Sequence, residues 1–141
     1  MSWRALIICF SVEKIHNGHK YMFIDGEFTQ SEAVAVCEEQ HGSLAMADDL
    51  ETFRVLWRLL NDSRGPTDDK FIGAWLDGKL DANGVWQCES NNVECSQDMP
   101  WTKHEPARHE DEECVLLWLP RSDGVAHYYC TRKMSAICEV K

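Results

Sequence analysis

The chain has 141 residues, of which 44% are hydrophobic, so it is long enough for one hydrophobic core and too short for two. Asp and Glu number 24 against 14 Lys and Arg, and the resulting formal charge of -10 argues against a nucleic-acid partner, because phosphate binding needs a positive surface. No apolar run approaches the roughly 20 residues that cross a bilayer, so no membrane span is expected.

Seven cysteines are many for a chain of this size, and none of them lies in a Cys-x-x-Cys pair. Zinc ribbons and thioredoxin-like redox sites therefore lack their usual spacing, and disulfides formed in an oxidising compartment are the better explanation. The apolar run at residues 5–10 is shorter than the usual core of a signal peptide, and no small-residue cleavage site follows it. The cysteines alone thus predict a secreted protein or a location on the extracellular face of the cell surface.

The first elements are predicted to be a β-hairpin and a helix. Two β-forming runs flank Asn17-Gly18, a dipeptide typical of a tight turn, which indicates a hairpin over residues 12–24. Capping residues then precede a helix over residues 32–40, and its apolar spacing places Cys37 on the buried face.

A second helix is predicted after a short extended link. Asp48 and Asp49 place two carboxylates at its positive end, and an apolar stripe with helical spacing continues to Leu60. The polar residues 61–70 contain a Gly-Pro breaker and are expected to form an exposed loop. Asn61 begins an Asn-Asp-Ser triplet, which is an N-glycosylation acceptor in a secreted chain.

The second half of the chain consists of short β-like runs divided by turns, and two helices followed by a strand-rich half indicate an α+β fold. The strands are predicted at residues 71–76, 84–87, 114–119, 125–130 and 135–140. A long polar segment with little periodicity occupies residues 87–113. Loops of this length are usually functional or tied down, and Cys88 and Cys95 offer a tie.

Four motifs in the chain resemble those of the C-type lectin-like domain. They are Phe-Ile-Gly-Ala at 71–74, Trp-Thr-Lys-His-Glu-Pro at 101–106, Glu-Cys-Val at 113–115 and Ala-Ile-Cys-Glu at 136–139. In order and spacing they are similar to the family's Trp-Ile-Gly-Leu, Trp-x-x-Gly-Glu-Pro, Asp-Cys-Val and apolar-x-Cys-Glu segments. The resemblance implies an N-terminal extension at residues 1–11 and one domain over residues 12–141, with two helices packed on small antiparallel sheets and a long loop region closed by a disulfide.

The resemblance also implies a disulfide pattern. The two bridges shared by the family correspond to Cys37–Cys138 and Cys114–Cys130, which leaves Cys88–Cys95 as a third bridge across the long segment. On the sequence alone six cysteines allow many pairings, so the resemblance makes this choice. Cys9 has no partner, because the position where longer family members carry one is Lys20 here. It is either a thiol that links two chains or a residue without a role.

The calcium site of sugar-binding family members is incomplete in this sequence. There, the resemblance implies, a Glu-Pro-Asn motif, an acidic residue and an Asn-Asp pair hold calcium and bind the sugar. Here the first motif ends in Ala107, and Ala126-His127 stands where the Asn-Asp pair would be. Of the expected calcium ligands, Glu105 and Glu112 remain. Because calcium requires about six to eight oxygen ligands, we expect no calcium-dependent monosaccharide binding and no cofactor.

Two other metal sites are considered. A secondary calcium site found in some family members would use four carboxylates, for which ordinary solvated acids are the other interpretation. Those carboxylates are Asp77, Asp81, Glu112 and Glu113. A zinc hypothesis uses three histidines of the second half, which show no characteristic ligand spacing. They are His104, His109 and His127.

The sequence contains none of the catalytic motifs considered. Gly-x-Ser-x-Gly, His-Glu-x-x-His and a phosphate-binding glycine loop are all absent from the sequence. The acidic run at residues 110–113 imitates a glycosidase pair, yet neighbours on one loop more often form a charge cluster. Such a negative cluster suits a basic protein or peptide partner, or is a solvated turn. We therefore expect a binding module and not an enzyme.

The favoured function is recognition of a protein or polymeric ligand through the long loop. The residues expected to contact it are Trp101, Lys103, His104, Glu105, Arg108, His109, Glu112, His127 and Tyr128. Core packing is the competing interpretation for Trp101 and for the nearby Trp86. Two alternative functions stay open: a carbohydrate-binding lectin with an altered calcium or metal site, and a subunit of an assembly linked through Cys9.

Overall fold

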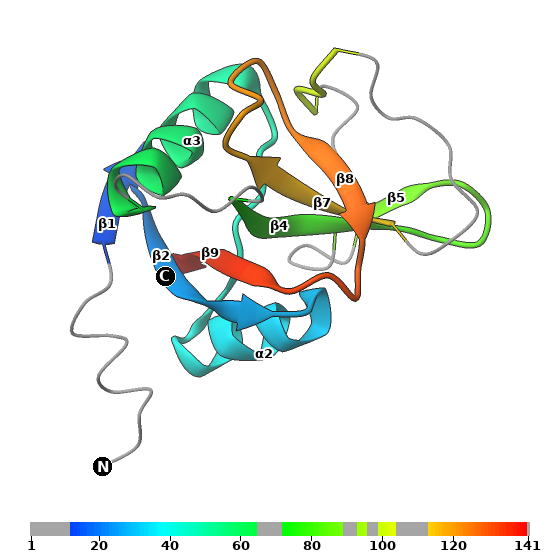
Figure 1. Cartoon of the computed structure of the whole chain (residues 1–141), viewed down its shortest axis with the longest axis horizontal. Coiled ribbons are helices and arrows are strands. Elements are labelled where there is room, and N and C mark those ends of the chain that lie inside the picture. Colours follow the sequence, from blue (N-terminus) through cyan, green and yellow to red (C-terminus); the bar gives the residue numbers. More distant parts are fainter. Residues whose placement is uncertain (1–11, 65–71, 89–92, 96–98, 104–112, 141) are drawn as a thin grey trace.

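A computed structural model of the chain describes residues 12–64, 72–88, 93–95, 99–103 and 113–140 (Figure 1). In chain order the described elements are β1 (Val12–His16), β2 (His19–Phe28), α2 (Gln30–Glu39), β3 (Gly42–Leu44), α3 (Leu50–Arg64), β4 (Gly73–Leu80), β5 (Trp86–Cys88), β6 (Val93–Glu94), β7 (Glu113–Trp118), β8 (Ala126–Tyr129) and β9 (Met134–Val140). The predicted α+β class is confirmed.

The strands form one mixed sheet with the order β1-β2-β9-β4-β5-β6. Strand β3 also pairs with β9, while β7 pairs with both β4 and β8. Most pairs are antiparallel, but β4 and β9 run parallel, with Trp75 opposite Ala136. The β1–β2 turn is the predicted one, because Asn17 and Gly18 have φ values of 50° and 79°, the left-handed conformation that such a tight hairpin turn requires.

The sheet separates two hydrophobic cores. Side chains alternate along the central strands, so that in β2 Tyr21 and Phe23 join the core that contains α3, whereas Met22 and Ile24 join the core that contains α2. Strands β4, β7 and β9 divide their side chains in the same way. Both faces of these strands are therefore buried, which explains why the sequence shows continuous apolar runs there.

The first helix begins two residues earlier than predicted, because Thr29 is its N-cap. The Thr29 hydroxyl accepts a hydrogen bond from the Glu32 N–H, and the Glu32 carboxylate accepts one from the Thr29 N–H, which completes a capping box. Cys37 is buried as expected.

Helix α3 extends to Arg64, so the loop predicted for residues 61–70 is wrong for its first four residues. The last turn of the helix contains Asn, Asp and Ser, which have low helix propensity. It is nevertheless helical because the apolar face of α3 is packed against the core and because Asp62 forms an ion pair with Lys14 of β1 at 3.2 Å. Asn61 is an exposed residue of this last helical turn.

Three disulfides join these elements, and they are the pairs that the resemblance implies. Cys37–Cys138 ties α2 to β9, Cys114–Cys130 ties the start of β7 to the end of β8, and Cys88–Cys95 closes a loop of the long segment. Cys9 lies outside the described residues. In the described part of the chain no helix is long and apolar enough to cross a bilayer.

Candidate functional site

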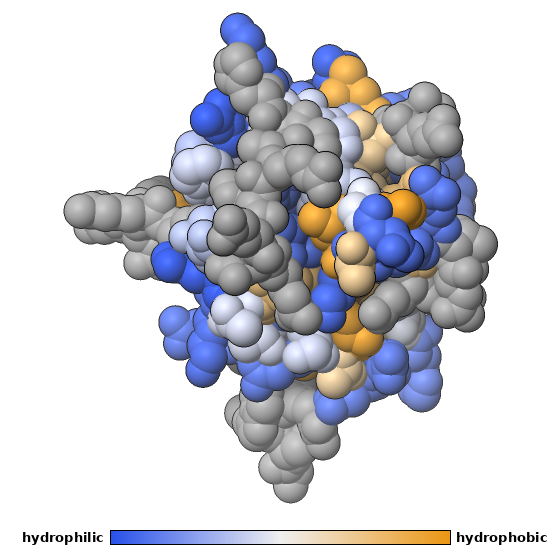
Figure 2. All heavy atoms as spheres, turned by 90° about the vertical axis from the view of Figure 1, so that its right-hand side faces the viewer, coloured by the Kyte–Doolittle hydropathy of each residue, from blue (hydrophilic) through white to orange (hydrophobic). Residues whose placement is uncertain are grey.

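A shallow groove lies on the side of the molecule that carries β5. It has a volume of about 280 Å³ and is lined mainly by Val85, Trp86, Glu94, Cys95, Met99 and Trp101. The rings of Trp86 and Trp101 are 5.0 Å apart and tilted by 52°. Figure 2 looks onto this side and shows hydrophobic residues grouped beside strongly hydrophilic ones. The groove therefore combines aromatic and apolar surface with one acidic residue at its edge.

Trp101 is held by the neighbouring segment that contains Gly124 and Val125. The Val125 N–H donates to the Pro100 carbonyl at 2.8 Å, and the Thr102 N–H donates to the Val125 carbonyl at 2.8 Å. Gly124 is required for this close approach, because a Cβ there would collide with the Pro100 carbonyl oxygen and lie 2.5 Å from the Thr102 nitrogen. The backbone of Trp101 is thus fixed from both sides.

Asp123 adds a side-chain anchor to the same segment. It accepts hydrogen bonds from the Thr102 hydroxyl at 2.6 Å and from the Lys103 N–H at 3.2 Å. These bonds, led by the one from the Thr102 hydroxyl, hold the pKa of Asp123 below its usual range because they favour its ionised form. The tryptophan is therefore presented by a rigid segment.

The other wall of the groove depends on a turn organised by Asp81. Its carboxylate accepts hydrogen bonds from the Val85 N–H at 2.9 Å, the Asn83 N–H at 2.8 Å and the Gln87 amide at 3.0 Å. These bonds, with the one from the Val85 N–H first, lower the pKa of Asp81. Cys95, joined to Cys88, donates its N–H to the Trp86 carbonyl at 2.9 Å. Trp86 is thereby positioned opposite Trp101.

A buried polar pair supports the two tryptophans. His127 of β8 places its Nδ1 atom 2.8 Å from Glu113 Oε2 of β7, and both side chains are almost fully buried. The imidazole ring lies 5.5 Å from the Trp86 ring and 5.9 Å from the Trp101 ring. The second oxygen of Glu113, Oε1, has no hydrogen-bond partner within the described residues. The hydrogen-bonded pair thus lies buried beside both tryptophan rings.

The structure brings together some of the predicted ligand residues and separates others. Trp101 lines the groove, and Lys103 is exposed two residues further along. His127 is buried, so it supports the tryptophans and does not present its ring to a ligand. Tyr128 is partly buried and packs against the core on the α2 side of the sheet, where Arg132 lies 5.9 Å from its ring. Five further predicted contacts, His104, Glu105, Arg108, His109 and Glu112, lie outside the described residues.

The predicted metal ligands have other structural roles where they are described. Asp81 organises a turn, Asp77 is a buried residue of β4, and Glu113 is paired with His127. Within the described ranges, no three His, Cys, Asp or Glu side chains are grouped as metal ligands. Glu112, His104 and His109, the other members of the calcium and zinc hypotheses, are outside those ranges.

Sequence reasoning missed several residues that build the groove. Val85, Glu94 and Met99 lie in turns and in the long segment, where no periodicity marks them. Core packing, the competing interpretation for Trp86, holds in part, because this residue packs partly against the core while its remaining surface lines the groove. No neighbouring residue in the sequence indicates that position 124 must be glycine. The need arises from close contact with a segment more than twenty residues away.

The chain belongs to the C-type lectin domain family. The family model for the lectin C-type domain matches residues 27–140. The resemblance on which the fold was predicted is confirmed, and this fold is generally non-enzymatic. No curated protein matches the sequence significantly.

Solved structures show the same fold at low identity. The C-type carbohydrate-recognition domain of cow CD23, crystallised in the presence of a GlcNAc2Man3 oligosaccharide, matches with a TM-score of 0.70 at 21% identity and covers 90% of this chain and 91% of that one. Human lithostathine matches with a TM-score of 0.75 at 21% identity over 92% and 88% of the two chains. A calcium-independent type II antifreeze protein matches with a TM-score of 0.71 at 17% identity over 92% and 94%.

Proposed function

We propose that this domain is an extracellular binding module that recognises a protein or polymeric ligand through the groove between Trp86 and Trp101, without calcium-dependent monosaccharide binding. Three disulfides favour the extracellular location, since such bonds persist in oxidising compartments.

The proposal rests mainly on which side chains occupy positions 126 and 127. In sugar-binding relatives these positions supply two oxygen-bearing side chains to calcium. Here Ala126 has no side-chain oxygen, and the His127 imidazole is buried against Glu113 at 2.8 Å. A hard divalent ion prefers several oxygen ligands, and this part of the site offers it none.

The groove supplies an alternative binding surface. Trp86 and Trp101 are half-buried, so each keeps exposed aromatic surface while its backbone is held rigid. Aromatic side chains on a rigid support dominate binding energies, because little conformational entropy is lost on contact. An apolar or aromatic side chain of a partner protein, or the face of a ring in a polymer, fits this surface.

One solved structure with this fold is described as calcium-independent, which is consistent with this proposal. The calcium-independent type II antifreeze protein has the same fold, so the fold itself does not require calcium for function. Calcium independence of this particular chain rests on its own residues at 126 and 127.

A glycan array probed with the full chain tests the proposal. The array is run once with calcium and once with a chelator, and we expect no monosaccharide to be bound in a calcium-dependent way. Calcium-dependent binding of simple sugars would instead support the alternative of a lectin with an altered site.

Substitution of the groove tests where the ligand binds. For any protein or polymer that is bound, Trp101→Ala is expected to weaken binding by about 30-fold or more, the effect of losing a central aromatic contact. Tyr129→Ala is the matched control, because Tyr129 is an exposed aromatic residue that does not line the groove. Equal effects of the two substitutions would contradict a site at the tryptophans.

A further inference from the structure

The triplet Asn61-Asp62-Ser63 lies in the last turn of α3 and not in a loop. An Asn-x-Ser triplet is an acceptor for N-linked oligosaccharides in secreted chains, provided that x is not proline. Because the triplet is defined by its first and third residues, the transferring enzyme must reach both the asparagine amide and the serine hydroxyl. The conformation of α3 therefore decides when this triplet can be modified.

The helical conformation separates these two groups. Successive residues of an α-helix are about 100° apart around its axis, so residues 61 and 63 are about 200° apart and point to nearly opposite sides. The burial of the two residues agrees with this geometry. Asn61 is exposed, whereas the Ser63 Oγ atom is buried and has no hydrogen-bond partner among the described residues. An enzyme that reaches the Asn61 amide of the folded chain thus cannot also reach the Ser63 hydroxyl.

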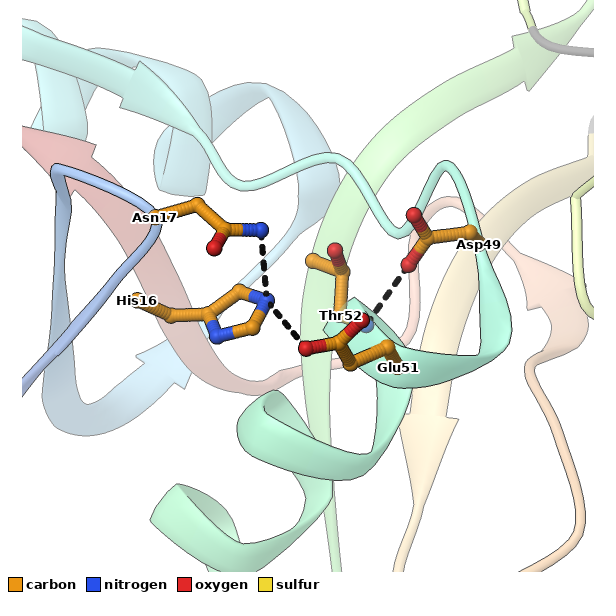
Figure 3. A network of polar contacts seen from close by, with 5 residues as sticks. All are labelled: His16, Asn17, Asp49, Glu51 and Thr52. Atoms are coloured by element: carbon orange, nitrogen blue, oxygen red, sulfur yellow. Dashed lines mark hydrogen bonds and ion pairs between the residues drawn. The ribbon is translucent and has the colours of Figure 1, made fainter.

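Contacts at the start of α3 keep it helical. Asp49 caps the helix, because its Oδ1 atom accepts a hydrogen bond from the Thr52 N–H at 2.7 Å. Beside this cap, the His16 Nε2 atom of β1 lies 3.7 Å from the Glu51 Oε1 atom (Figure 3). The first turn of α3 is therefore fixed both by its own cap and by β1.

The last turn of α3 is held by an ion pair and by the packing of the turn before it. Leu59 and Leu60 are fully buried in the core. Asp62, the middle residue of the triplet, forms the 3.2 Å ion pair with Lys14 of β1. Unwinding the triplet would break this ion pair and the helical hydrogen bonds to the preceding turn. An extended triplet is therefore a minor state of the folded chain.

We propose that Asn61 is an N-glycosylation site that is modified on the unfolded chain, before the last turn of α3 forms, and that the folded domain then carries the oligosaccharide on this exposed helix end. In the transfer, the bond between C1 of the first sugar and the pyrophosphate of a lipid-linked donor breaks. C1 bonds to the Nδ2 atom of Asn61, the amide gives up one proton, and the lipid pyrophosphate leaves. This inference rests on the extracellular location in the proposed function, because export takes the chain past the transferring enzyme.

The folded domain can accommodate the oligosaccharide. Asn61 is exposed, so a sugar bonded to its Nδ2 atom need not displace any residue of the core. The end of α3 lies near β1, and β5, which carries Trp86 of the groove, is on the other side of the molecule (Figure 1). The modification is therefore compatible with folding and with a ligand in the groove.

Synthesis of the full chain behind a cleavable secretion signal, in the presence of microsomes, tests the site. We expect a mobility shift that peptide-N-glycosidase removes. Asn61 begins the only Asn-x-Ser or Asn-x-Thr triplet of the sequence, so Asn61→Gln and Ser63→Ala should both abolish the shift. Ser63→Ala should leave the thermal midpoint unchanged, because the buried hydroxyl has no described hydrogen-bond partner. A native chain without the shift, or a shift that persists in Ser63→Ala, would overturn the proposal.

A second experiment tests the order of folding and modification. The unmodified chain with its disulfides formed, and the same chain after reduction and alkylation, are each incubated with the purified transferase and a lipid-linked donor. We expect the folded chain to be modified at least about tenfold more slowly, because the conformation that the enzyme needs is a minor one there. Equal rates for the two forms would overturn the proposed order.

The fold of the modified chain is compared with that of Asn61→Gln. We expect the same helical signal in far-UV circular dichroism, because the oligosaccharide projects from an exposed position. Loss of helical signal in the glycosylated chain would overturn the arrangement proposed for the folded domain. Because the added signal supplies the location, a missing oligosaccharide counts against Asn61 as an acceptor and not against the extracellular location.

Discussion

The Nδ1 atom of His127 lies 2.8 Å from the Oε2 atom of Glu113, and both side chains are buried. In sugar-binding relatives the position of His127 corresponds to an acidic calcium ligand. In this chain the imidazole is engaged with a carboxylate of the adjacent strand and supports two aromatic rings. A position that serves metal binding elsewhere in the family therefore serves the structure of the groove here.

Glu113→Gln is expected to destabilise the domain. The change puts an amide in place of the buried carboxyl group that bonds His127, and a buried polar group left without its partner costs about 1–3 kcal/mol. Urea denaturation followed by tryptophan fluorescence measures the change in unfolding free energy. Glu94→Gln, an exposed acid at the rim of the groove, should change it by less than about 0.5 kcal/mol. An unchanged denaturation midpoint for Glu113→Gln would contradict a stabilising pair.

Gly124→Ala is expected to disturb the segment that holds Trp101. The added methyl group would collide with the Pro100 carbonyl oxygen, so the two segments must separate at a cost of about 1–3 kcal/mol. Thermal unfolding measures the loss of stability, and near-UV circular dichroism reports the altered surroundings of the tryptophan. Gly18→Ala is unsuitable as a control because of its positive φ, so Ala82→Gly, in an exposed turn, is used instead. A native near-UV spectrum in Gly124→Ala would show that the close approach is not required.

The disulfides are expected to differ in their contributions to stability. In the chain-entropy description, a bridge that spans 101 residues contributes about 4.7 kcal/mol, and one that spans 7 residues contributes about 2 kcal/mol. Replacing Cys37 and Cys138 by alanine should therefore lower the unfolding free energy more than replacing Cys88 and Cys95. Parallel denaturation curves of the two double variants provide the comparison. The reverse order would show that native-state packing, rather than loop length, determines their effects.

Acid should weaken the anchor at Asp123. The folded-state pKa of this residue lies below the unfolded value of 3.8, so the ionised form stabilises the fold at higher pH and this contribution is lost as pH falls through the folded pKa. Asp123→Asn is expected to lower the thermal midpoint at neutral pH and to reduce its fall between about pH 5 and pH 2. Melting curves across this range measure both effects. A variant whose midpoint falls as steeply as that of the native chain would contradict the role of Asp123.

Local patterns predicted most of the fold. Asn17 and Gly18 mark a turn that only a left-handed backbone can make, and the apolar stripe of α3 is explained by its packed face. The end of α3 was misplaced because its last turn is stabilised by contact with β1, which residue propensities do not report. Turn residues and apolar periodicity can be recognised in a sequence, whereas contacts between distant segments cannot.

The candidate site was less predictable for the same reason. Trp101 could be identified from its motif, but the groove also requires Trp86, Met99 and the close approach of Gly124, which come together only in the folded chain. Burial of His127 likewise depends on its pairing across β7 and β8.

Calorimetric titration of the full chain with calcium tests the proposal that residues 126 and 127 provide no calcium site. We expect no saturable heat up to about 10 mM calcium, a concentration above the range of weak extracellular calcium sites. A variant that combines Ala107→Asn, Ala126→Asn and His127→Asp serves as the positive control, because it restores the oxygen ligands. Saturable binding by the native chain, with stabilisation against heat by the same ion, would show that this protein retains a calcium site after all.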